Sequence, residues 1–157
     1  MIIEVSQDFT LPYPSTLEHA VLYLTDVQKS LAQVRFIRDL QISGKQIYAN
    51  LIVDVPVLGE QKLDFHSILE PHRTGANLLA QERTGRAWAA VAGQGSAVQN
   101  ANGTQILYAL QIAVHLELLV GDKWGGKAFE KMARATAQTA IQRLTLEFGR
   151  GVLAGMP

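Results

Sequence analysis

One pair of neighbouring segments constrains the fold of this chain more than any other feature: a long alternating strand followed closely by a long amphipathic helix. Over residues 105–119 every second side chain is apolar, which is the period of a half-buried strand. After a turn, apolar residues recur every three or four positions from about 126 to 148, as in a helix with one buried face. Together these segments predict a sheet covered by a C-terminal helix.

Ahead of this pair the sequence predicts a first strand, one shorter helix and then a run of strands. Residues 3–11 alternate apolar with polar, and two prolines end that strand. Ser15 and Glu18 form a capping box, which predicts the start of a helix that ends near Asp26. Five further strands are expected over residues 34–42, 47–55, 63–69, 76–83 and 87–98.

The order of these segments predicts the fold class. Consecutive strands joined by short turns are antiparallel neighbours. We therefore expect an α+β fold in which an antiparallel sheet of about seven strands wraps around a long C-terminal helix, in the order strand, helix, six strands, helix. Gly93 and Gly95 lie inside one predicted strand and suggest a bulge or a bend there.

The composition indicates one globular domain and argues against several classes of protein. The chain has 157 residues, 48% hydrophobic and 18% charged, which predicts a single domain over 1–157 with a flexible tail from about 150. Fourteen basic and fourteen acidic residues leave no basic footprint for nucleic acid. The chain has no cysteine, which excludes disulfides and thiolate metal sites. Without a signal peptide or an integral membrane segment, a cytoplasmic location is expected.

The order and spacing of the segments resemble the START-like, helix-grip (SRPBCC) superfamily, which includes polyketide cyclases, lipid-transfer domains and plant pathogenesis-related proteins. The resemblance is carried by the strand through Phe9, the helix start at Pro14-Ser15, the strands from Val34 to Leu119 and the helix from Gly126. It implies that a lipid, quinone or polyketide-like molecule lies between the sheet and the final helix. The chain is similar to uncharacterised bacterial members, and it lacks the glycine-rich loop of the plant branch.

Arg38 is a charged residue within an apolar register, between Phe36 and Leu40. A buried guanidinium requires a partner, because an unpaired buried charge is very unfavourable. Arg38 therefore anchors a carboxylate or phenolate of an apolar ligand, or extends to water at a rim, or pairs with an internal acid such as Asp26. The sequence leaves these three interpretations open.

The residues expected to line a cavity share the apolar registers of the strands and the final helix. Gln7, Ser67 and Tyr108 are polar members that could orient a ligand. Small residues on the helix, among them Ala140, either allow close packing or leave space for a ligand. The candidate ligand-binding residues are Gln7, Phe36, Arg38, Leu51, Phe65, Ser67, Tyr108, Ile112, Phe129, Met132, Thr136 and Ala140.

The sequence offers no catalytic or metal constellation. His66 and His115 fall in the polar register of their strands, whereas a zinc site requires three or four converging ligands. Ser96 lacks the flanking pattern of a nucleophile elbow. Trp124 is either a lid at the start of the final helix or a loop aromatic over the core edge. We expect no catalytic residue, no metal and no cofactor.

Three functions therefore remain open. The first, favoured by the lack of a catalytic constellation, is non-enzymatic binding, sequestration or transport of a small hydrophobic ligand. The second is a cyclase- or hydrolase-like enzyme, which requires Arg38, Tyr108 and Ser67 to converge on one pocket. The third is a groove for an apolar segment of a partner protein. A homodimer is compatible with each of them.

Overall fold

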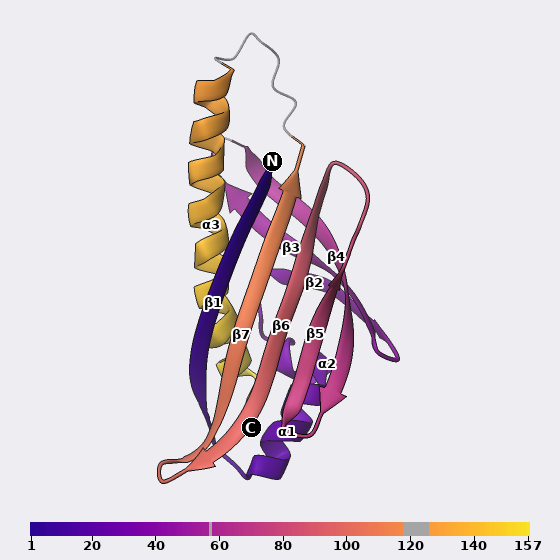
Figure 1. Ribbon diagram of the computed structural model, residues 1–157, viewed down its shortest axis with the longest axis vertical. Helices are drawn as coiled ribbons and strands as arrows, with labels where there is room; N and C mark the ends of the chain where they lie inside the picture. The colour runs from indigo at the N-terminus through magenta and orange to yellow at the C-terminus, as the bar shows by residue number, and fades with distance from the viewer. Residues whose placement is uncertain (57, 118–125) are drawn as a thin grey trace.

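The computed structural model describes residues 1–56, 58–117 and 126–157, and its elements follow the predicted order (Figure 1). The elements are β1 (Ile2–Tyr13), α1 (Leu17–Thr25), α2 (Val27–Ser30), β2 (Ile37–Ser43), β3 (Gln46–Val55), β4 (Gly59–His72), β5 (Gly75–Gln81), β6 (Ala87–Asn100), β7 (Gly103–Leu116) and α3 (Lys127–Ala154). The predicted α+β class is confirmed. None of the described helices combines the length and the apolar composition needed to cross a membrane.

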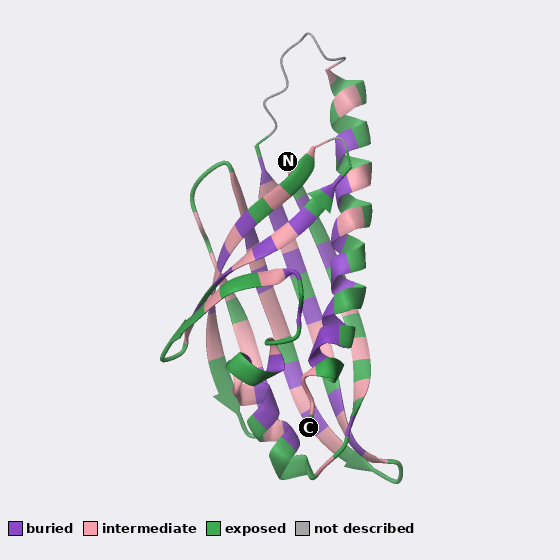
Figure 2. Cartoon of the chain, turned by 180° about the vertical axis from the view of Figure 1, so that it is seen from behind, coloured by how far each residue is buried: buried purple, intermediate pink, exposed green. Residues whose placement is uncertain are grey.

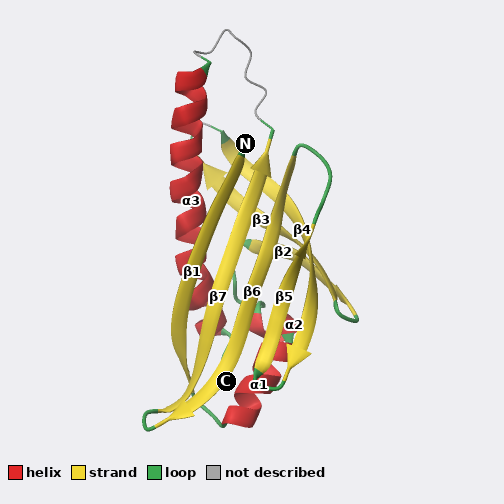
Figure 3. Ribbon diagram, viewed as in Figure 1, coloured by secondary structure: helices red, strands yellow, loops and turns green. Residues whose placement is uncertain are grey.

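The seven strands form one sheet in the order β1-β7-β6-β5-β4-β3-β2. The first strand pairs antiparallel with the last along its whole length, from Ile2 opposite His115 to Tyr13 opposite Thr104. The remaining strands pair in chain order, each antiparallel to the next. Figure 3 shows the curved sheet with α3 beside its β1 edge and the two short helices at one end. This arrangement confirms the predicted helix-grip fold.

The final helix covers the apolar face of the sheet as predicted. Ala133, Ala137 and Ile141 on α3 are completely buried, and so is Ile106 on β7. Figure 2 shows exposed residues along the opposite side of α3. Burying a side chain the size of isoleucine contributes about 1.5–3 kcal/mol, so this stripe accounts for much of the helix's attachment.

The start of α1 differs from the predicted capping box. Thr16, not Ser15, is the N-cap, because its side chain accepts a hydrogen bond from the backbone N–H of His19. The Ser15 hydroxyl instead lies 2.8 Å from Nδ1 of the same histidine. Either hydroxyl satisfies the rule for a helix start, and the backbone direction before the helix decides which one is used.

The end of α3 also differs from the prediction. The helix continues through Phe148 to Ala154, and both Gly149 and Gly151 lie inside it. A Cβ on Gly151 would lie 2.7 Å from Cα of Val34, so this glycine allows close approach of two backbones. The single domain over 1–157 and the flexibility of its end stay predictions, and Trp124 lies outside the described residues.

The glycines of β6 do not form the bulge that the sequence suggested. This strand pairs with β7 from Ala87 to Asn100 without a register shift. A Cβ on Gly95 would lie 2.8 Å from Cδ2 of Leu24, so the glycine makes room for α1. A register shift occurs instead in the β2–β3 pair, between Arg38 and Gln41.

Tyr23 joins the first helix to the last. Its hydroxyl donates a 2.6 Å hydrogen bond to the backbone carbonyl of Val152, and both residues are buried. The Val152 carbonyl also accepts a 3.2 Å hydrogen bond from the N–H of Gly155, so removing the Tyr23 hydroxyl does not leave it unpaired and costs only the net value of one hydrogen bond, about 0.5–1.5 kcal/mol. We expect Tyr23→Phe to lower the free energy of unfolding by this amount, measured by urea denaturation.

The same variant should change the pH dependence of stability. Burial, and secondarily the neighbouring Tyr13, raise the pKa of Tyr23 from 10.0 to about 12. As the pH rises, the unfolded chain loses this proton before the folded protein does. The contribution of the Tyr23 phenol to the free energy of unfolding is therefore fully present below about pH 10 and is lost as the pH rises toward 12. We expect Tyr23→Phe to lessen this loss. An unchanged slope between pH 10 and 12 would contradict the assignment.

Candidate functional site

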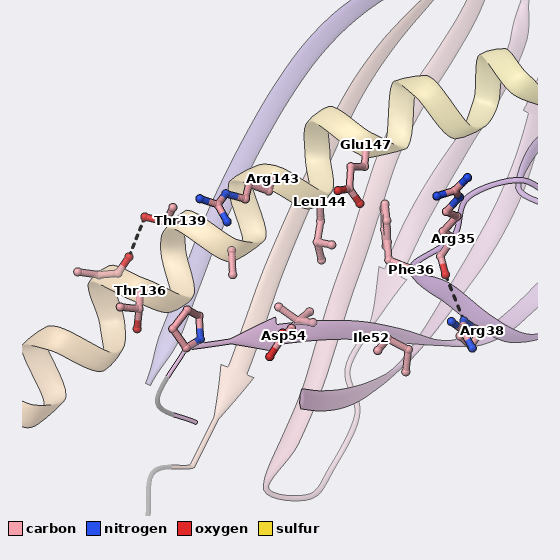
Figure 4. A pocket seen from close by; sticks show the side chains of 14 residues that line it. Arg35, Phe36, Arg38, Ile52, Asp54, Thr136, Thr139, Arg143, Leu144 and Glu147 are labelled. Carbon is pink, nitrogen blue, oxygen red and sulfur yellow. Dashed lines mark hydrogen bonds between the residues drawn. The ribbon is translucent and has the colours of Figure 1, made fainter. Parts of the chain in front are cut away.

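A groove of about 640 Å³ lies between α3 and β3. Thr136 and Ala140 of α3 and Ile52 of β3 line its two sides, and the buried Leu144, Val53 and Phe36 form an apolar floor between them. Figure 4 shows the groove from close by, with the helix on one side and the strand on the other. The groove lies beside α3, along the stretch of β3 that faces it, and not beneath the helix.

The groove exists because β3 extends further than its partner β2. The β2–β3 pairing starts at Ile37, opposite Leu51. Beyond it, the N–H of Ile52 donates to the carbonyl of Phe36 at 2.9 Å, and no described strand lies beside the rest of β3 on that side. Helix α3 lies over this open stretch, and its small Ala140 leaves the space unfilled.

Some small residues of α3 allow close packing on the sheet, and others leave space beside the helix; the sequence had left these two roles open. Ala133 and Ala137 are completely buried and allow close packing. Thr136 and Ala140 are half-buried and line the groove. The Thr136 hydroxyl donates to backbone carbonyls one turn earlier at 3.1 Å, and Thr139 does the same. Because these hydroxyls already donate hydrogen bonds within the helix, the part of the wall around Thr136, Thr139 and Ala140 presents mainly apolar atoms to a ligand.

Charged side chains stand around the apolar floor of the groove. Arg35 and Arg38 lie at one end, Arg143 and Glu147 project from α3, and Asp54 comes from β3 (Figure 4). Among the described residues, none of these five forms an ion pair within 4.0 Å. Nε of Arg38 donates to the carbonyl oxygen of Arg35 at 3.2 Å. The groove therefore combines an apolar floor with three cationic and two anionic groups at its rim.

A smaller interior cavity of about 70 Å³ lies between the two short helices and the sheet. Tyr108 lines it, and this ring lies 5.2 Å from Phe9 and 5.7 Å from Phe148 between centroids. Burial first, and the nearby Tyr23 second, raise the pKa of the Tyr108 phenol, which therefore stays neutral at ordinary pH. Ligand pockets usually measure about 300–1,000 Å³, so the groove has the size of a ligand site and this cavity does not.

The remaining polar candidates have structural partners. The buried Ser67 hydroxyl donates to the carbonyl of Val91 at 2.7 Å. His66 stacks on Tyr48 with centroids 4.3 Å apart, and His115 stacks on Trp88 at 3.8 Å. Both histidines alternate with buried core residues and so occupy the outer face of the sheet, as predicted. In the described ranges no three histidine or acidic side chains gather as a metal site would require.

The structure brings only some of the twelve candidate residues together. Phe36, Arg38, Thr136 and Ala140 share the groove. Phe65 and Tyr108 line the interior cavity. The other six lie outside the groove and the interior cavity. Leu51, Ser67 and Ile112 belong to the packed core, and Phe129 and Met132 lie near the start of α3. Gln7 is on β1, on the side that faces α3. A ligand-binding role for the whole set stays a prediction.

Arg38 does not point into the core, although it shares the sequence register of Phe36 and Leu40; among the three interpretations that the sequence left open, its exposure fits an arginine that extends to water at a rim. It is exposed and pairs with Asn50, next to Ile37, which lines the interior cavity in its place. The side chain therefore reaches the groove from its rim. The alternative partner Asp26 pairs with Lys29 at 3.9 Å.

Sequence reasoning missed Arg35, Arg143 and Glu147 as residues of the groove. A signal was present on the helix, because Thr136, Ala140, Arg143 and Glu147 follow one another at intervals of four, three and four. Residues at these intervals share one helical face. That face lies beside the apolar stripe and combines small with charged side chains, as expected for the wall of a groove that opens to water.

Comparison with known proteins identifies both a family and a fold. The family described as "Protein of unknown function (DUF3809)" matches residues 8–146. A search of curated proteins finds no match.

Solved structures resemble the chain along nearly its whole length. The Zhui aromatase/cyclase from Streptomyces sp. R1128 has a TM-score of 0.63 at 17% identity, covering 98% of this chain and 93% of that one. A conserved protein from Geobacillus kaustophilus has a TM-score of 0.55 at 15% identity, covering 97% and 96%. A protein from Thermus thermophilus has a TM-score of 0.54 at 12% identity, with complete coverage of both chains. These likenesses confirm the START-like, polyketide cyclase-like fold.

Proposed function

This chain belongs to the DUF3809 family, whose description gives no function, and we propose from its fold and its groove that it binds a small hydrophobic ligand between α3 and β3. The ligand is a lipid, quinone or polyketide-like molecule. The protein sequesters or carries it and does not convert it chemically.

The groove itself carries this proposal. Its volume of about 640 Å³ falls within the usual range of ligand pockets. Its floor includes Phe36, Val53 and Leu144, which are buried beneath the opening. Covering apolar surface contributes about 25 cal/mol per Å², and because these three side chains are already buried, a flat or elongated apolar molecule gains free energy here mainly by removing its own surface from water. Polar groups stand only around it, where they can orient the ligand.

An enzyme is the second candidate, because the Zhui protein is named an aromatase/cyclase. The three residues expected to act together give it little support. Arg38 lies on the open groove, Tyr108 lines the interior cavity, and Ser67 is buried and bonded to backbone. A Ser15–His19 hydrogen bond exists, but no carboxylate in the described part of the chain bonds that ring.

Filling the groove tests the proposal. We expect Ala140→Phe to weaken binding of N-phenyl-1-naphthylamine, a neutral apolar fluorophore, by at least about tenfold, because the new ring occupies the space of the probe. Fluorescence titration measures the affinity, and thermal unfolding shows whether the variant is folded.

Gln138→Phe is the matched control on the same helix. Gln138 is exposed and is not part of the groove, so the same ring added there should leave the affinity unchanged. Equal affinity in both folded variants, or no binding by the unmodified protein, would show that the groove is not a site for apolar ligands.

A further inference from the structure

We propose that the ligand of the groove is a monoanionic amphiphile: a single carboxylate bound by Arg38, and an apolar body lying on Phe36 and Leu144. This inference rests on the proposed function and specifies the chemistry of the ligand. Figure 4 shows both arginines at one end of the groove, with the Arg38 side chain next to the backbone carbonyl of Arg35 and the Arg35 guanidinium extending away from it.

Both arginines have hydrogen-bond donors that the described residues leave unused. A guanidinium has five N–H donors and no acceptor. In the described chain Arg38 uses only Nε, toward a backbone carbonyl, and Arg35 has no side-chain hydrogen bond or ion pair. The terminal nitrogens of Arg38 are therefore free to take both oxygens of a carboxylate, which is the strongest geometry for this pair.

The backbone holds Arg38 in this position. Asp39 has a φ of 57°, a left-handed conformation that only a few non-glycine residues adopt readily. Its carboxylate accepts a 2.9 Å hydrogen bond from Asn50 and lies 3.5 Å from Nζ of Lys62. The register shift beside it directs Arg38 to the rim, and bulges commonly re-aim side chains at functional sites.

The charges around the groove favour a ligand with a single negative charge. The groove has three arginines and two acids, Asp54 and Glu147, which gives it a net charge of +1. The acids lie further along the groove than the Arg35–Arg38 end (Figure 4). Arg143 lies beyond both acids, so a second negative charge on the ligand body would lie near a carboxylate before it reached this third arginine. One anionic head and an uncharged body fit this distribution.

Competition with three ligands of equal chain length tests the inference. Decanoate, 1-decanol and decylammonium each displace N-phenyl-1-naphthylamine according to affinity. We expect decanoate to bind at least about tenfold more tightly than decanol, because a charge-assisted bond is added, and decylammonium to bind most weakly. The preference for decanoate should shrink as salt is added, because the rim is exposed.

Arg38→Gln should remove the preference for decanoate over decanol, whereas Arg38→Lys should retain part of it. Arg73→Gln, in the exposed turn after β4, is the control and should change nothing. Equal binding of decanoate and decanol by the unmodified protein, or a preference that survives Arg38→Gln, would overturn this inference and leave the apolar site standing. Failure of all three ligands, together with no binding of the fluorophore, would instead overturn the proposed function.

Discussion

Replacing Phe148 with alanine is expected to lower the free energy of unfolding by about 3–5 kcal/mol. Phe148 is 7% exposed, and its ring lies 5.8 Å from Phe9 and 5.7 Å from Tyr108 between centroids. The substitution therefore removes contacts from α3 to both β1 and β7. Urea denaturation followed by circular dichroism measures the loss.

Phe148 also lines the interior cavity, so its removal should enlarge that cavity. Apolar cavities of this kind stay dry and bind small apolar molecules. We therefore expect benzene to raise the unfolding temperature of Phe148→Ala and to leave that of the unmodified protein nearly unchanged.

Phe129→Ala is the control for the loss of stability, since Phe129 is half-buried near the start of the same helix and its replacement should cost less. Equal losses in the two variants would mean that the aromatic cluster does not hold α3 in place.

The fold could be predicted from sequence because period and order alone specify it. The alternation over 105–119 and the helical period after 126 gave the last strand and the covering helix. Register within a strand was predicted well where no residue was inserted, as for Ser67, which is buried in line with Leu63 and Phe65. It failed at Arg38, because the left-handed backbone of Asp39 shifts the pairing and alternation in the sequence does not record such a shift.

The site could be predicted only in part, because a groove depends on where elements end. Thr136 and Ala140 were identified from their helical face, but Arg35 enters the site only because β2 begins too late to cover β3. The expected large cavity under the helix is also mostly absent from the described structure. Ala133 and Ala137 bring α3 onto the sheet, so the larger hollow lies beside the helix and not beneath it.

Gly75→Ala is expected to destabilise the protein by at least about 3 kcal/mol, since neither neighbour of the new methyl group can move freely. A Cβ on Gly75 would overlap the backbone carbonyl oxygen of Gly95 and lie 2.9 Å from Cδ1 of Leu24. The β5–β6 ladder extends only from Gly75 to Leu78 on β5, so moving the backbone would open much of it. Leu78 lines the interior cavity, so the loss would extend to that wall.

Gly93→Ala separates this clash from the general effect of adding a methyl group to a strand. Gly93 pairs with Leu78 in the same ladder, yet a Cβ there would lie 3.1 Å from the carbonyl oxygen of Ala109, with a Leu110 methyl next nearest at 4.0 Å. Alanine restricts the unfolded chain more than glycine does, and this gain offsets the cost of such a contact. The change in the free energy of unfolding should therefore stay within about 1 kcal/mol. Both variants are compared by urea denaturation. A stable Gly75→Ala protein would mean that the β5–β6 edge yields easily, and that the wall of the interior cavity can open without unfolding the sheet.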